Sequence, residues 1–254
     1  MLSWTLGGYP SFNLEMASGH YWETEADDNG GFADRRSGSV AERLKGKFGD
    51  RAGAAIADAS RLFSAAFREF PFHIAVAYKA PQNVGPANPL WLMPSGYSAT
   101  TVCYPYDDLQ RWRGIYPEDV FAEQLRKLSE GWQQGIDCLR SAKPQLHPGA
   151  ENDFTDILHS ALGAYYHFRS AYLQTEFVRS RNRWLGADEP SSKEAERVKL
   201  LAIVDEEIVL AKQLYDLVRR DSRIGYEASN HYYYTKQDLQ EKVLNCLSVR
   251  EQLQ

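Results

Sequence analysis

Apolar residues recur at spacings of three and four along most of the chain, which is the pattern of one buried helix face. Leu44 and Phe48 share such a face, and the pattern resumes after Gly49 and continues to Phe70, where Pro71 ends it. Similar stretches follow in the second half of the chain. The pattern predicts helices over about residues 40–48, 55–70, 117–139, 151–185, 191–220 and 235–252.

Residues with known preferences for helix ends support these limits. Pro117 suits a first helical position, and Ser191 with Glu194 and Thr235 with Asp238 have capping-box spacing. The short turn after residue 185 predicts an antiparallel hairpin, so we expect a three-helix bundle after Pro144. We expect its core to include Phe154, Leu158, Leu162, Tyr165, Leu201, Ile208 and Tyr215.

Two regions lack a helical period. Residues 2–6 read as a short strand, and residues 81–114 are punctuated by prolines yet rich in tyrosine and tryptophan, which is typical of an ordered loop. We therefore predict a mainly α fold, a helical bundle with an N-terminal remnant strand and a long ordered loop region. Residues 1–115 would form one part, with a helical hairpin and long loops, and residues 116–254 a C-terminal α-helical bundle domain.

Composition narrows the class of partner. The 254 residues carry a formal net charge of -5, which argues against nucleic-acid binding. No run of about 18 apolar residues occurs, so no membrane span is expected. The N-terminus lacks the features of a signal peptide, so the cytoplasm is the default location. The three cysteines contain no CxxC pair, which argues against a disulfide framework or a structural zinc site.

Motifs for metal or nucleophilic chemistry are weak. Asp156 and His159 have the i, i+3 spacing of half a carboxylate-bridged di-iron site, but the sequence has no second copy. It also has no P-loop, no GxGxxG fingerprint and no GxSxG nucleophile elbow. We expect neither a metal nor a cofactor.

Several irregular segments combine rings with amide or carboxylate groups, which is what sugar binding needs. We expect these groups to gather around one concave surface and bind carbohydrate: Trp4, Tyr9, Gln82, Asn83, Asp107, Glu227 and His231. The alternative is structural, with rings packed between helices and polar groups at helix ends. In that case Glu227 would pair with Arg223 across a turn.

The chain resembles the C-terminal part of large bacterial glycoside-hydrolase-like proteins, in which a helical domain follows a (β/α)8 barrel. The resemblance lies in the phrases LSWTLGGYPS at residues 2–11, FREFPF at 67–72, APQNVGPAN at 80–88, YPYDD at 104–108 and DSRIGYEASNHYYY at 221–234. It implies that residues 2–6 are the last barrel strand and that an upstream barrel domain or chain is a partner. It also implies that Trp4 or Tyr9 stacks on a sugar ring and that Asp107 accepts from its hydroxyls.

Whether the chain is an enzyme stays open. A glycosidase usually needs two carboxylates on either side of the scissile bond, and the neighbours Asp107 and Asp108 are poor candidates for that pair. Glu227 is the one candidate acid or base, and we expect very low activity from the chain alone. Two hypotheses remain. The chain is part of a carbohydrate-active protein and contributes loops to a sugar site, or it is a non-catalytic helical interaction or scaffold protein.

Overall fold

A computed structural model describes residues 39–79, 85–94, 96, 107–225 and 234–254. Within these ranges the chain forms eight α-helices and no strand, which confirms the predicted mainly α class. The strand predicted at residues 2–6 lies outside the described residues, as does part of the loop predicted at 81–114. None of the helices in these ranges is both long and apolar enough to cross a bilayer.

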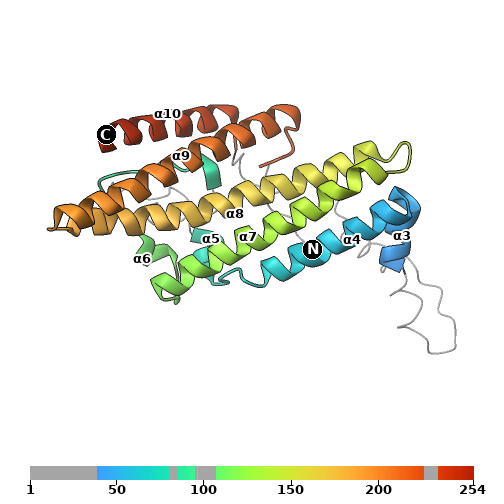
Figure 1. Ribbon diagram of the computed structural model, residues 1–254, viewed down its shortest axis with the longest axis horizontal. Coiled ribbons are helices and arrows are strands. Elements are labelled where there is room, and N and C mark those ends of the chain that lie inside the picture. Colours follow the sequence, from blue (N-terminus) through green and yellow to red (C-terminus); the bar gives the residue numbers. More distant parts are fainter. Residues whose placement is uncertain (1–38, 80–84, 95, 97–106, 226–233) are drawn as a thin grey trace.

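Five long helices lie side by side in chain order, each packed on the next and running up and down (Figure 1). A short helix at one end, α3, packs on the first of them. The bounds are α3 Ser39–Phe48, α4 Asp50–Phe67, α7 Glu118–Ala142, α8 Glu151–Gly186, α9 Pro190–Arg220 and α10 Lys236–Leu253. The three helices expected after Pro144 are α8, α9 and α10, but they pack as part of the row and not as a separate bundle: α9 contacts both α8 and α10, and α8 also packs on α7.

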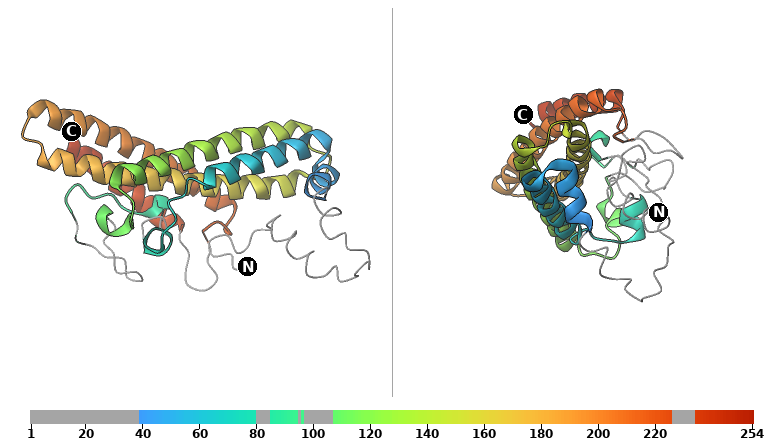
Figure 2. Two further views of the ribbon diagram at one scale, coloured as in Figure 1. Left: turned by 90° about the horizontal axis from the view of Figure 1, so that it is seen from below. Right: turned by 90° about the vertical axis from the view of Figure 1, so that its right-hand side faces the viewer.

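Small elements cover one side of this row. Helices α5 (Ile74–Lys79) and α6 (Leu109–Trp112) and the 3-10 turn η2 (Gly85–Ala87) all lie on the same side of the long helices (Figure 2). The turn η2 packs against α8, α9 and α10. This side therefore carries the described parts of the predicted loop region.

The helix ends follow local chemistry. At the start of α10, the Thr235 hydroxyl accepts from the Asp238 backbone N–H at 3.1 Å, and the Asp238 side chain accepts from the Thr235 N–H, so this capping box is confirmed. The capping box predicted for Ser191 and Glu194 is wrong. The helix starts one residue earlier, at Pro190, whose fixed φ suits the first turn, and Glu194 instead pairs with Arg197 at 2.7 Å.

The predicted core is confirmed for two of its seven residues, and the other five lie at the edge of the core. Phe154 and Ile208 are buried, whereas the other five, Leu158, Leu162, Tyr165, Leu201 and Tyr215, are partly buried and pack against the core clusters. Helices α4 and α7 meet closely because α7 presents glycines to α4: a Cβ on Gly135 would lie 2.4 Å from the Phe63 ring. Helix α4, from the predicted first part, packs along α7, from the predicted second part. The division of the chain into two parts stays a prediction.

Candidate functional site

Helix α8 carries a row of polar side chains along one face. Steps of three or four residues connect Asp156, His159, Gly163, His167, Ser170, Gln174, Val178 and Arg181, and all except the glycine and the valine are polar. We call the six polar residues the α8 polar stripe. Ser170, Gln174 and Arg181 are buried, and His159 and Asp156 are partly buried. Helix α8 thus buries polar groups as well as apolar ones.

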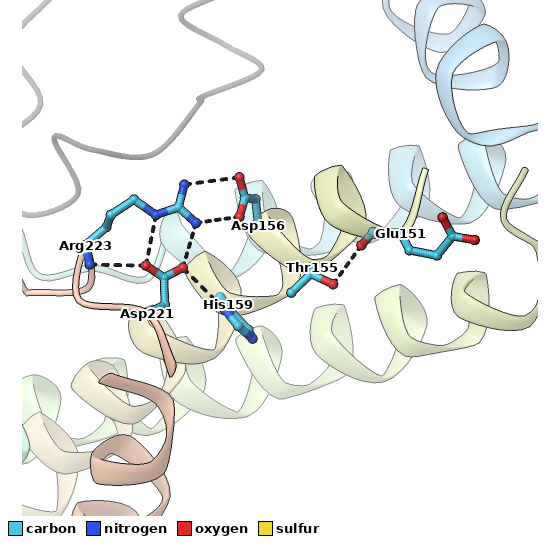
Figure 3. Close-up of polar contacts among 6 residues, drawn as sticks. All are labelled: Glu151, Thr155, Asp156, His159, Asp221 and Arg223. Atoms are coloured by element: carbon cyan, nitrogen blue, oxygen red, sulfur yellow. Dashed lines mark hydrogen bonds and ion pairs between the residues drawn. The ribbon is translucent and has the colours of Figure 1, made fainter. Parts of the chain in front are cut away.

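At the N-terminal end of the stripe, Arg223 lies between two carboxylates (Figure 3). Its Nη1 donates to Asp156 at 3.2 Å, and its Nε and Nη2 donate to Asp221 at 2.9 and 2.7 Å. Asp221 follows the last residue of α9 and also accepts from the Arg223 backbone N–H at 3.1 Å. His159 Nδ1 lies 3.4 Å from the Asp221 carboxylate. The four groups tie the end of α9 to α8.

This arrangement contains an Asp–His pair but lacks the remaining parts of a catalytic triad in the described residues. The Thr155 hydroxyl donates to the Glu151 carbonyl at 2.7 Å within its own helix, on the side away from His159 (Figure 3). Across the described ranges, no group of three or more His, Cys, Asp and Glu side chains could hold a metal ion. The interactions that the structure shows among these groups are ion pairs and hydrogen bonds.

Further along the stripe, two loop segments meet at His167. The Tyr234 hydroxyl hydrogen-bonds His167 Nδ1, and Gly85 lies so close that a Cβ there would be 2.8 Å from Nδ1. Gly85 adopts φ 47, which an L side chain rarely does. Burial lowers the pKa of His167 to about 4, so the ring is neutral at pH 7 and its Nδ1 can accept from Tyr234.

Beyond His167 the stripe forms a buried hydrogen-bond network with the η2 segment. Gln174 donates to the Gly85 carbonyl at 2.8 Å and accepts from Asn88 at 2.7 Å. Ser170 donates to Glu207 of α9 at 2.9 Å. These bonds replace the water that the polar groups would otherwise need.

An ion pair in this network is fully buried. Lys242 of α10 lies 3.2 Å from the Glu207 carboxylate and also donates to the Asn88 carbonyl, and both charged side chains are 0% exposed. Burial raises the pKa of Glu207, while the nearby Lys242 ammonium opposes that shift. The pair holds three helices and one loop segment together.

The C-terminal end of the stripe is Arg181. Its Nη1 donates to the Asp107 carboxylate at 2.9 Å and to the Trp91 carbonyl at 3.2 Å, and its Nη2 donates to the Asp107 carbonyl at 3.2 Å. The Arg181 and Asp107 side chains are 2% and 8% exposed. Arg181 therefore joins two separate stretches of the loop region to α8.

Of the predicted sugar-binding residues, Asp107 is the one the structure describes. Trp4, Tyr9, Gln82, Asn83 and His231 lie outside the described residues, as does the candidate acid or base Glu227, so their roles stay predictions. Asp107 contacts α8 at Arg181, 14 residues and therefore about 21 Å along the helix from His167. The segments next to Gln82 and His231, by contrast, both reach His167, through Gly85 and Tyr234.

The sequence reasoning missed the stripe although its signal was present. The spacing of these polar residues is helical, but the same helix also carries an apolar stripe, and the predicted core contains only apolar and tyrosine residues: Asp156, His159, His167, Ser170 and Gln174 are the polar ones. Under the structural alternative Arg223 would pair with Glu227, which lies outside the described residues, so that pairing stays a prediction; the described partners of Arg223 are Asp156 and Asp221.

Comparisons with known proteins give no relative: no protein-family model, no curated protein and no solved structure matches the chain.

Proposed function

We propose that the chain is a non-catalytic helical interaction protein, in which α8 holds loops in fixed positions as a binding surface. One observation carries the proposal: along the α8 polar stripe, each of the six polar side chains bonds another segment of the chain. Ser170 bonds helix α9, and the other five side chains hold segments outside the long helices in position. Loops on a rigid scaffold are where binding residues are disproportionately found.

The described residues 85–94, which we call the η2 loop, show how firmly a segment is held. Its Leu90 exchanges two hydrogen bonds with the Asn245 side chain of α10, at 2.8 and 2.9 Å, and Asn88 bonds Gln174 of α8. Trp91 and Met93 of the same loop are 40% and 64% exposed. A fixed backbone that presents exposed apolar side chains loses little conformational entropy when a partner binds.

Site-specific photo-crosslinking tests the proposal. A photoreactive residue at Met93 should give one defined protein adduct in the cells that produce the chain. The same residue at Leu244, which is 66% exposed on α10, serves as a matched control and should not give that adduct. Identical adducts from both positions, or none from Met93, would contradict the loop surface.

Carbohydrate is a second candidate ligand. One observation favours it: Gly85 and Tyr234 both contact His167, so the segments carrying Gln82, Asn83 and His231 have neighbouring anchor points on α8. Amide, imidazole and aromatic groups from those segments suit sugar hydroxyls and ring faces. The resemblance to glycoside-hydrolase-like proteins points to the same ligand class.

Titration of an oligosaccharide panel tests this second candidate. Saturable binding should be weakened by Asn83→Ala and by His231→Ala, and Gln252→Ala, an exposed change at the end of α10, should leave it unchanged. Aryl glycosides should be turned over very slowly or not at all. Robust turnover that Glu227→Gln abolishes would show that the chain is an enzyme by itself.

A further inference from the structure

Four large apolar side chains are exposed on two chain segments that meet near the end of α4 and the start of α7. Phe67, Phe72, Ile74 and Ile115 are 51%, 77%, 61% and 76% exposed. The two chain segments that carry them lie side by side, since the Tyr116 hydroxyl donates to the Phe72 carbonyl at 3.0 Å. We call these four side chains the Phe72 patch.

The backbone beneath the patch is fixed by several contacts. Gly114 adopts φ 66 against the His73 ring, where a Cβ would lie 2.6 Å from Nδ1. The same Nδ1 accepts from the Ala75 N–H at 3.1 Å, and the Phe67 ring stacks on Phe70 with centroids 5.3 Å apart. A partner would therefore meet a preformed surface.

The patch is comparable in size with the largest apolar patches on typical monomers. Two phenylalanines and two isoleucines with these exposed fractions present on the order of 500 Å² of apolar surface, a size at which patches on monomers are often functional. A stable interface needs about 800 Å² from each partner. The Phe72 patch therefore supplies more than half of one side of such an interface.

Two charged residues lie beside the patch and have opposite signs. Arg68 and Glu69 follow Phe67 directly, and neither side chain has an ion-pair partner in the described part of the chain. We propose that the Phe72 patch is a dimer interface with a second copy of this chain, related by a two-fold axis. Such an axis brings Arg68 of one protomer to the partner subunit's Glu69, and Glu69 to the partner subunit's Arg68.

The choice of a second copy follows from this self-complementarity. A two-fold interface places the same surface on both sides, so it needs an apolar centre and equal numbers of opposite charges at matching distances from the axis. Adjacent arginine and glutamate residues beside four apolar side chains supply the apolar centre and one charge of each sign from each protomer. An unrelated partner would not require both signs in neighbouring positions.

Sedimentation analysis of the full chain tests the proposal. The wild type should show a concentration-dependent monomer–dimer equilibrium. Phe72→Asp should raise the dimer Kd at least about 30-fold, as expected for a central interface side chain. Leu244→Asp is the matched control, because it places the same charge at an exposed apolar position on α10, and it should leave the Kd unchanged. Circular dichroism confirms that each variant folds.

Charge reversal separates this interface from a merely sticky surface. R68E places like charges opposite each other and should raise the dimer Kd about 10-fold, while R68E/E69R restores opposite charges and should return it to within about threefold of wild type. A wild type that stays monomeric at every concentration overturns the proposal. So does a dimer that resists Phe72→Asp, or one that the double reversal fails to rescue.

Discussion

Replacing His167 with asparagine should reduce the loss of stability that acidification causes. In the folded chain burial lowers the pKa of His167 from 6.5 to about 4, whereas the unfolded chain keeps the ordinary value. Between these two values the unfolded state binds a proton that the folded state does not. Stability is therefore complete above about pH 6.5 and falls as the pH drops toward 4.

The size of the effect follows from the two pKa values. A shift from 6.5 to about 4 corresponds to roughly 3 kcal/mol when the pH is below both values, and to about 2 kcal/mol at about pH 5. Because the residue as a whole is only partly buried, although its ring is enclosed, these figures are upper limits. The wild type should lose up to about 2 kcal/mol between about pH 7.5 and 5 from this residue alone.

Urea denaturation at the two pH values, followed by circular dichroism, measures this loss. Asparagine retains a polar atom near the position of Nδ1 for Tyr234 but does not titrate, so His167→Asn should show a smaller loss on acidification than wild type. His147→Asn, which removes a histidine at the turn before α8, should retain the wild-type dependence. Equal losses in wild type and His167→Asn would refute the reasoning.

Three further predictions concern packing and buried charge. Gly135→Ala should destabilise the chain by about 1–3 kcal/mol because its Cβ meets an α4 ring, whereas Gly46→Ala, with open space around it, should stabilise it by up to about 1 kcal/mol in urea titrations. Lys242→Met should cost about 3–5 kcal/mol by leaving Glu207 unpaired, and adding Glu207→Gln should recover part of that loss in a double-mutant cycle. Leu162→Ala should cost about 2 kcal/mol and lower the melting temperature, since Leu162 packs against two core clusters.

The helices were predictable because their signals are local. The limits of α8 and α10 agree with the sequence to within about two residues, since apolar spacing and the Thr235 cap act over a few residues. The second buried face of α8 was not predictable in the same way. Polar groups such as Gln174 usually indicate a solvated face, and this one is buried because Asn88, 86 positions away, supplies its hydrogen bond.

The contacts of the candidate site were also hard to predict from the sequence, because they join residues that lie far apart in the chain. Asp107 was predicted to bind sugar because it lies in an irregular segment. Its partner Arg181 lies 74 positions away, in a helix with an ordinary helical sequence pattern. A carboxylate next to aromatic residues can bind a ligand or neutralise a distant arginine. Only the tertiary arrangement distinguishes the two.

The up-and-down order of the long helices has a kinetic consequence. Each helix packs mainly on its neighbours in the chain, and contacts between residues close in sequence form quickly. The η2 loop is the exception, because Asn88 bonds Lys242 across 154 positions and must wait until α8 and α10 are both in place. We therefore expect the contacts of the η2 loop to form late in folding, and the amide hydrogens of Asn88 and of residues 90–92 to exchange with solvent sooner than those in the middle of α8.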